Sequence, residues 1–222
     1  AVVALFLLIL WKYVMYLPAE FVETNPELIR EVIAQFPLAT VVAQTAEGLT
    51  ANHIPLIMTA PDRIIGHIAI ANRLHEWVSP TQDIIAIFQG AQAYISPNWY
   101  PSKAESHSQV PTWNYEVVHV HGRMTFQHDE KSKIAAVGRL TKIFETQTNG
   151  ADAWRMSDAP ADFMKSKLAG IVAFEIAVTR IVAKSKLNQN KSRQDIENVS
   201  ENLLSQGAVR MSERMKRGKS TG

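Results

Sequence analysis

Apolar and polar residues alternate along several stretches of this chain, and short turn sequences separate one stretch from the next. A period of two is typical of β-strands that bury one face. The stretches expected to be strands are 38–44, 49–59, 64–70, 83–89, 91–96, 117–126 and 170–187. The connections between most of them are too short for the helical crossovers that parallel neighbours need. The pattern therefore predicts an α+β fold that is mainly antiparallel β, as a barrel or a strongly curled sheet.

Apolar residues spaced three and four apart predict helices outside these strands. The expected helices begin after caps at Asn25, Asn72, Asp129 and Ser192, with a further helical piece near Pro160. Asn, Asp and Ser suit a cap because their side chains accept hydrogen bonds from the first N–H groups of a helix. After Asp129 the apolar stripe is expected to be Ile134, Val137, Leu140, Ile143 and Phe144. The last helix should end at Gly207, before a tail containing Arg210, Arg214, Lys216, Arg217 and Lys219.

The composition excludes some classes of function. The chain of 222 residues is 46% hydrophobic and 20% charged, which is typical of a globular protein. Its net charge of +2 is too small to indicate nucleic-acid binding by itself. Without any Cys, the chain cannot form disulfides, Cys-ligated metal clusters or a thiol nucleophile. Nothing requires an oxidising compartment, so we expect a cytoplasmic protein.

The first ten residues, AVVALFLLIL, are wholly apolar. They are fewer than the roughly 20 that a membrane-spanning helix needs, and they lack the basic region and cleavage site of a secretory signal. We therefore expect no membrane partner. The predicted division is an apolar extension at 1–14, a working domain at 15–191, and a C-terminal helix with a basic tail at 192–222. We expect the extension to come from upstream sequence and not from the native domain, with a membrane anchor as the alternative.

The segment from Gln89 to Tyr115 has an unusual composition. Its second half combines three prolines with four large aromatic residues: Pro97, Pro101, Pro111, Trp99, Tyr100, Trp113 and Tyr115. Proline restricts the backbone, so this half is expected to be a stiff loop. Its aromatic rings either fill the space beneath the loop or form a wall for a flat ligand. In the second case the polar contacts would come from Gln89, Ser102, Lys103, Thr112 and Asn114.

Two sequences in this region, QGAQAYISPNWYPSK from Gln89 and VPTWNYEVVHVHG from Val110, resemble the PaiB-like FMN-binding negative transcriptional regulators. The similarity begins at Met15 and continues to about Lys191, through ANHIP at 51–55 and SKLNQNK at 185–191. The resemblance implies an FMN-binding split barrel that forms a homodimer, with the flavin at the interface between subunits.

The resemblance also implies which residues bind FMN. The amides of Gln89 and Asn114 suit the pyrimidine edge of the flavin, because an amide both donates and accepts hydrogen bonds. The rings of Trp99, Trp113 and Tyr115 suit stacking on its faces. The alternative is that these rings fill the end of the barrel or a dimer interface.

The phosphate of FMN needs hydrogen-bond donors, and a helix N-terminus provides them. The segment GHIAIANRLHEW is read as a strand, a turn and a capped helix, with His67, Asn72 and Arg73 around the turn. The other expected cofactor-binding residues are Asn52, His53, Lys103, His119, Lys186, Gln189 and Asn190. The ordinary structural interpretations are a surface helix cap, a hydrogen-bonded core histidine and a strand-ending turn.

His119 and His121 are expected on one face of their strand, opposite Val118 and Val120. Two imidazoles suit a metal, but no third ligand is evident nearby, so we expect hydrogen-bonded histidines beside the site and no metal. DNA is a possible partner through the basic tail, although the sequence contains no helix-turn-helix or zinc-finger pattern.

Three functions remain open at this point. The first is an FMN-binding homodimeric regulator of the PaiB type. The second is an FMN-dependent oxidoreductase similar to the pyridoxamine-phosphate oxidases, in which the flavin exchanges hydride with a substrate. The third is a split barrel that binds haem, with His119 or His53 as the axial ligand.

Overall fold

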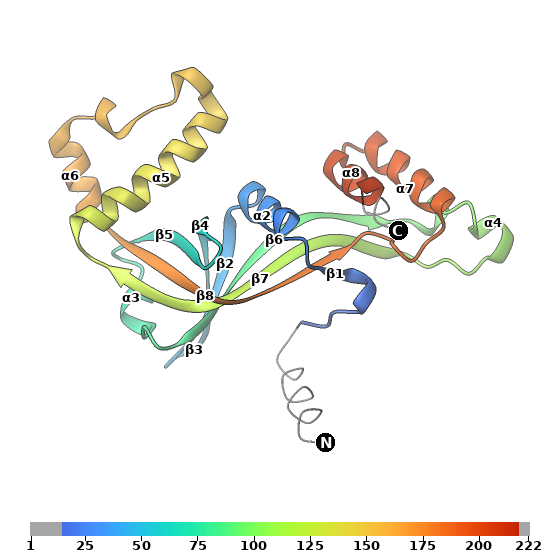
Figure 1. Cartoon of the computed structure of the whole chain (residues 1–222), viewed down its shortest axis with the longest axis horizontal. Helices are drawn as coiled ribbons and strands as arrows, with labels where there is room; N and C mark the ends of the chain where they lie inside the picture. Colours follow the sequence, from blue (N-terminus) through green and yellow to red (C-terminus); the bar gives the residue numbers. More distant parts are fainter. Residues whose placement is uncertain (1–14, 218–222) are drawn as a thin grey trace. The chain divides into compact units, whose positions relative to one another are not determined.

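The structure is a computed structural model that describes residues 15–217 (Figure 1). The expectations for residues 1–14 and for Lys219 lie outside the described residues. The strands are β1 (Val22–Glu23), β2 (Leu38–Thr45), β3 (Gly48–Pro55), β4 (Ile57–Ala60), β5 (Arg63–Ala69), β6 (Asp83–Ile95), β7 (Thr112–Gln127) and β8 (Ile171–Lys186). The α-helices are α2 (Pro26–Gln35), α3 (Leu74–Trp77), α4 (Lys103–Ser106), α5 (Glu130–Asn149), α6 (Ala161–Ala169), α7 (Arg193–Ser205) and α8 (Val209–Arg217).

Within the described residues the strands form one eight-stranded sheet in the order β3-β2-β6-β7-β8-β5-β4, and β1 pairs with β8. The strand pairs β2–β3, β2–β6, β4–β5 and β5–β8 are antiparallel. The predicted α+β class with mainly antiparallel strands is confirmed. The chain contacts separate into two compact units. We call residues 15–32, 89–118 and 182–217 the first unit, and residues 33–88 and 119–181 the second unit.

The second unit is the curled part of the sheet. Its core is made of residues that alternate along each strand, such as Ile64 and Ile68 on β5 and Ile176 on β8. Gly66 lies between the two β5 residues, where a Cβ would come within 2.6 Å of the Phe174 ring. The missing side chain lets the strand approach that ring closely. Since β3 also contacts β5, the sheet curls back on itself, as the short connections predicted.

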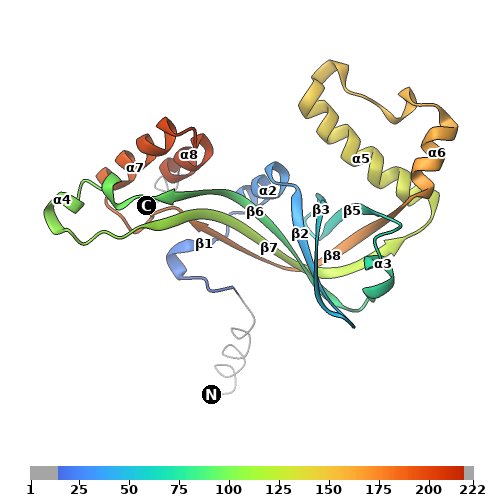
Figure 2. The ribbon, with the colours of Figure 1, turned by 180° about the vertical axis from the view of Figure 1, so that it is seen from behind.

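The first unit has helices on one face of its strands. Figures 1 and 2 show α7 and α8 on the same side of β6 and β7. The core between them consists of Ile95, Tyr100, Leu187, Ile196, Val199, Leu203, Met211 and Met215. Part of the tail expected after Gly207 is a further helix, because residues 209–217 form α8, which buries Met211, Met215 and Arg214.

A buried ion pair explains why the basic helix α8 packs on the sheet. The carboxylate of Glu116 on β7 is 1% exposed, and its Oε1 lies 2.6 Å from Nε of Arg214. Its Oε2 lies 3.4 Å from Nε of Arg210, and Glu23 lies 3.5 Å from Arg214. A carboxylate that has been taken out of water needs such partners. The basic residues of α8 therefore point inward as well as outward.

The segment predicted as two strands around Gly90 is one continuous strand, β6. The side-chain alternation shifts there. A Cβ on Gly90 would lie 2.9 Å from Cβ of Glu116, on the side of α8, and Ala91 also packs on the α7–α8 core. Two successive residues thus face one side, as in a β-bulge. After this shift Tyr94 faces away from α8. The periodicity of the sequence did not predict this shift in alternation, because Gly90 has no side chain whose polarity would indicate the face on which it lies.

Strand β7 and helix α5 also differ from the expectation. β7 begins at Thr112, so Trp113 and Tyr115 lie in a strand and not in the preceding loop. In α5 the buried residues are Ala136 and Leu140, whereas Ile134 and Ile143 are exposed. The apolar stripe of α5 is wider than the surface of the second unit that covers it.

His67 is a partly buried histidine of the second unit. It lies between the inward-facing Gly66 and Ile68 and therefore on the other face of β5, opposite Ala173 of β8. Helix α5 contacts this strand. The Nδ1 atom of His67 is buried without a hydrogen-bond partner, and burial lowers the pKa of His67.

The close contact at Gly122 gives a stability prediction. A Cβ there would lie 2.5 Å from the Ala177 carbonyl oxygen and 2.7 Å from Cγ2 of Ile176. Because the backbone of β8 cannot yield, we expect Gly122→Ala to lower the free energy of unfolding by about 1–3 kcal/mol. Urea denaturation measures this change. Gly170→Ala is the matched control, because its nearest atom is 3.5 Å away. Equal effects of the two substitutions would contradict the packing described here.

The burial of His67 gives a pH prediction. Because its pKa is lower in the folded state, the unfolded chain takes up the proton first. The free energy of unfolding should therefore fall as the pH decreases below about 6.5. We expect His67→Leu to make this pH dependence shallower, although His119 and His121, whose pKa values are also lowered by burial, will leave some of it. The control is His107→Asn, at an exposed position. Parallel curves for the parent and His67→Leu would refute the assignment.

Candidate functional site

Helices α7 and α8 cover only one face of the first unit's strands. The opposite face, which we call the open face, carries Gln89, Gln92, Tyr94, Trp113, Tyr115, Lys184 and Lys186. Trp113 is 53% exposed and Tyr94 is 47% exposed. Their rings meet edge to face with centroids 6.1 Å apart. Two large rings held in this way offer a flat apolar surface to a ligand.

Two lysines near the end of β8 lie on the same face of the strands. Nζ of Lys186 donates a hydrogen bond to the Trp113 carbonyl oxygen at 2.8 Å and another to Oγ1 of Thr112. Burial lowers the pKa of Lys186, and the nearby charge of Lys184 acts in the same direction. Nζ of Lys184 lies 5.2 Å from the Tyr115 ring and 5.4 Å from the Tyr16 ring. These contacts fix both cations beside the aromatic surface.

Three residues predicted as ligands do not lie on the open face. Asn114 is fully buried on the face that α8 covers, and its Nδ2 lies 3.4 Å from Sδ of Met215. The prediction for Asn114 is corrected for this reason, since neighbours on a strand point to opposite faces. Trp99 packs on the α7–α8 core and its carbonyl accepts a hydrogen bond from Asn198. Lys103 donates to Asn98 on the same loop.

The proline-containing loop is fastened to the start of α7. The buried carboxylate of Asp195 accepts hydrogen bonds from Ser102 N at 3.1 Å and from Ser102 Oγ at 2.8 Å. Gln109 donates to the same hydroxyl at 2.8 Å, and Lys191 donates to Gln109 at 2.7 Å. The sequence indicated Asp195 only as part of a helix start. Its partners are 93 positions away in the chain, so local patterns could not reveal this second role.

Several polar side chains of the turn after β8 form hydrogen bonds within the protein. Asn188 has a positive φ of 63° and donates from Nδ2 to the Tyr100 hydroxyl at 2.8 Å. The Gln189 side chain accepts from Leu187 N at 2.7 Å and donates to the Ser185 carbonyl. Asn190 remains exposed. The strand-ending turn that was one of the two interpretations is therefore present, and it draws Gln189 into local contacts.

In the second unit, the strand–turn–helix segment brings three of the predicted residues together. Nδ2 of Asn72 donates to Oδ1 of Asn52 at 2.9 Å, and Oδ1 of Asn72 accepts from Leu74 N at 3.1 Å. Asn72 therefore contacts the first residue of α3, but the N-cap position of this helix is Arg73 and not the predicted Asn72. Nε of Arg73 lies 2.8 Å from Oε2 of Glu76, and its guanidinium lies 5.1 Å from the centre of the Trp77 ring. Asn52, Asn72 and Arg73 can hold an anion if Arg73 exchanges its surface partner.

The predicted histidines lie on other surfaces of the second unit. His53 follows Asn52 on β3 and so points to the opposite face, where Nδ1 lies 3.1 Å from Oγ1 of Thr40. His67 lies on the β5 face opposite Ala173, and its expected contact with the phosphate stays a prediction. For the same reason of alternation, Asn52 and His53 cannot contact one ligand from the same face.

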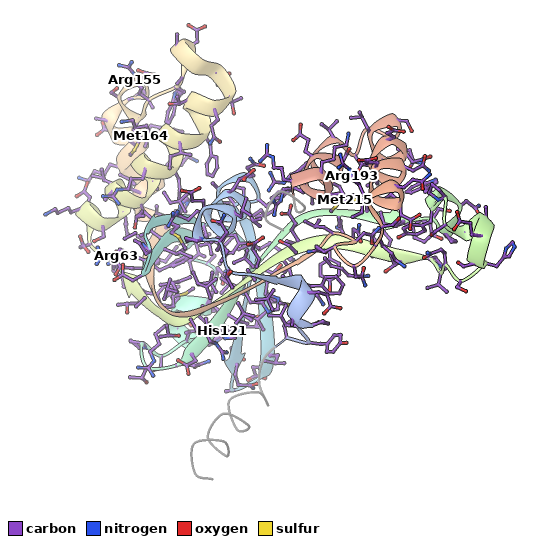
Figure 3. All side chains as sticks on the ribbon, turned by 45° about the vertical axis from the view of Figure 1, so that its right-hand side comes forward. Arg63, His121, Arg155, Met164, Arg193 and Met215 are labelled. Carbon is purple, nitrogen blue, oxygen red and sulfur yellow. The ribbon has the colours of Figure 1, made fainter. Side chains whose placement is uncertain are left out.

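His119 and His121 share one face of β7, as the alternation predicted. Nη2 of Arg180 lies 3.3 Å from Nδ1 and 3.2 Å from Nε2 of His121, which places the guanidinium across the ring (Figure 3 labels His121). Between residues 15 and 217 no group of three His, Cys, Asp or Glu side chains is arranged to hold a metal. Over the same residues no helix is long and apolar enough to cross a membrane.

Comparison with known proteins gives the family. Residues 15–180 match the family described as "Putative FMN-binding domain". The chain is 35% identical to "Protease synthase and sporulation protein PAI 2" of Bacillus subtilis over 193 residues, which are 85% of this chain and 89% of the relative.

Solved structures resemble the chain in fold. The flavocytochrome Anf3 from Azotobacter vinelandii has a TM-score of 0.57 at 15% identity, over 79% of this chain and 74% of its own. The FAD and haem binding protein from Mycobacterium smegmatis also has a TM-score of 0.57, at 14% identity and over 78% of each chain. At these identities the likeness shows the fold alone, and it confirms the expected flavin-type split barrel.

The residues of this chain fit a flavin on structural grounds of their own. The Tyr94–Trp113 ring pair is exposed, and a flavin needs a flat apolar surface of this kind. The fixed ammonium group of Lys186 lies beside it and suits the anionic part of FMN. The match to the family over most of the chain and the similarity to PAI 2 together show that this protein belongs to the PaiB-like family of FMN-binding proteins, with FMN as its cofactor.

Proposed function

We propose that this protein is a regulator of the PaiB type, a cytoplasmic homodimer that holds FMN and lowers the transcription of its target genes. The observation that carries the proposal is the open face, which presents aromatic rings, amides and the fixed Lys186 to a flavin. The name of the B. subtilis relative associates that protein with protease synthesis and sporulation. Both are processes that a cell controls at the level of gene expression, and this supports a regulatory role.

In this proposal the open face binds the ring system of FMN. Trp113 and Tyr94 contact the flat face of the ring, and the amides of Gln89 and Gln92 reach its pyrimidine edge. Lys186 remains near an anionic oxygen because Thr112 and Trp113 hold its ammonium group. When bound, FMN supplies a ring that can take up and return electrons. Gln92 and Tyr94 were not predicted, since the shift at Gly90 decides that they face this side.

A second copy of the chain is the partner that completes the open face. Tyr16, Val22, Tyr94 and Trp113 are all exposed large side chains of the first unit. An uncovered apolar face of this size in water is unfavourable and is typical of an interaction surface. The homodimer implied by the resemblance would cover these residues and shield the flavin from water.

The role of Trp113 can be tested by truncation. We expect Trp113→Ala to weaken FMN binding by roughly 3- to 10-fold, because a stacked aromatic contact contributes about 0.5–1.5 kcal/mol. Titration of the apoprotein with FMN, followed by flavin fluorescence, measures the dissociation constant. The matched control is Trp154→Ala, which removes an exposed indole from the second unit and should leave FMN binding unchanged. An unaltered affinity in Trp113→Ala, with the dimer intact by light scattering, would show that the ring lies elsewhere.

The regulatory role can be separated from the oxidoreductase alternative in one preparation. The FMN-loaded protein is used to select sequences from a randomised DNA library, and selected fragments are tested by gel shift over a salt series. We expect an enriched sequence whose retardation weakens with salt, as phosphate contacts require. The same sample is mixed with NADH or NADPH and candidate substrates such as pyridoxamine phosphate. Sustained turnover without sequence-specific retardation would favour the enzyme and reject the regulator.

A further inference from the structure

Helices α5 and α6 of the second unit are linked by a segment that encloses a cavity. The cavity has a volume of about 660 Å³ and lies between α5 and residues 150–157. This volume is within the range of small-molecule sites. Figure 1 shows the segment running out between the end of α5 and the start of α6, and Figure 3 labels Arg155 on it. None of the residues assigned above to FMN lines this space. We call it the arm cavity.

The wall of the arm cavity is fastened to α5. The Glu145 carboxylate of α5 accepts a hydrogen bond from Trp154 N at 3.0 Å and another from Asn149 Nδ2 at 2.8 Å. The Asp158 carboxylate accepts from Arg155 N at 2.8 Å. The hydrogen bond from Trp154 to Glu145 joins the segment to α5, whereas the bond from Arg155 to Asp158 lies within the segment and holds its local turn. The cavity is therefore bounded by an ordered wall and does not depend on a chance opening of a loop.

The charges at the arm cavity favour an anion. Lys142 from α5 and Arg155 from the segment both line it. Among the ion pairs of the described residues, neither of these cations has a carboxylate partner. The two carboxylates that help to shape the wall, Glu145 and Asp158, already accept N–H donors. Asp152 lies on the same segment but does not line the cavity.

The remaining surface of the arm cavity favours a flat apolar body. Trp154 lines it and is 41% exposed, and Met156 lies beside it. Gly138 forms part of the α5 side, where a Cβ would lie 3.7 Å from Sδ of Met156. A glycine inside a helix costs roughly 1 kcal/mol relative to alanine. Here the missing side chain leaves space in front of Met156.

We propose that the arm cavity binds a small organic anion with a flat apolar body, of the aromatic carboxylate or sulfonate class, as an effector of the protein. Trp154 and Met156 contact the body, while Lys142 and Arg155 pair with the anionic group. The effector role rests on the regulatory function proposed above, whereas the binding itself does not. A ligand in the arm cavity contacts both α5 and the 150–157 segment. A change in the contacts between these two elements would transmit the binding of the effector.

The test uses the full chain saturated with FMN and isothermal titration calorimetry. Naphthalene-1-sulfonate is the anionic probe, and 1-naphthylmethanol is the neutral probe with the same ring system. We expect saturable binding of one sulfonate per chain and at least 10-fold weaker binding of the alcohol. Lys142→Gln and Arg155→Gln should each weaken sulfonate binding by roughly 5- to 10-fold, as expected for a charge-assisted contact. Gly138→Leu should abolish it by filling the cavity.

Arg139→Gln is the control, because Arg139 is exposed on α5 and does not line the cavity. It should bind the sulfonate as the parent does. The proposal is overturned if no saturable binding occurs, if the alcohol binds as tightly, if Gly138→Leu and Lys142→Gln both bind normally, or if excess FMN displaces the probe. If the parent protein binds the sulfonate but selects no DNA sequence, the regulatory function is rejected and the arm cavity remains a binding site for the anion.

Discussion

The buried ion pair between Glu116 and Arg214 determines which face of the first unit is available for function. Glu116 lies on β7 and is 1% exposed, with Arg214 of α8 at 2.6 Å. Breaking such a pair by removing one partner typically costs about 3–5 kcal/mol, because the other charge stays buried. This cost keeps α8 on the even-numbered face of β7. Trp113 and Tyr115 must then face the other way, where no helix of the first unit covers them.

The periodicity of the sequence predicted the strands and helices, but it did not predict which face of each strand a helix covers. The caps at Asp129 and Ser192 were predicted because each is a local signal. The burial of Asn114 was not predicted. Alternation shows only that Asn114 and Trp113 lie on opposite faces of the strand, and it does not show which of the two faces a helix covers. The covered face is decided by α8, whose residues were predicted only as a basic tail. Its partner Glu116 is 98 positions away in the chain, too far for any local pattern.

The two units contribute different chemistry. The first unit offers rings, amides and fixed lysines on one strand face, and these suit the ring system of a flavin. The second unit contains the Asn52–Asn72–Arg73 cluster and, apart from it, the arm cavity with Lys142 and Arg155. His67 of this unit is partly buried, and burial lowers its pKa. In the function proposed above, the cofactor and the effector would occupy separate surfaces, which gives the two distinct sites that regulation by an effector requires.

The contact between Trp113 and the flavin can be observed directly by ¹⁹F NMR of protein labelled with 5-fluorotryptophan. The chain has five Trp residues, and each signal can be assigned by replacing one Trp with Phe. Addition of FMN to the apoprotein should shift the Trp113 signal most, because the flavin ring current acts over short distances, and should leave Trp154 in place. A large shift at Trp99, on the covered side of the first unit, with none at Trp113, would contradict the assignment of the open face.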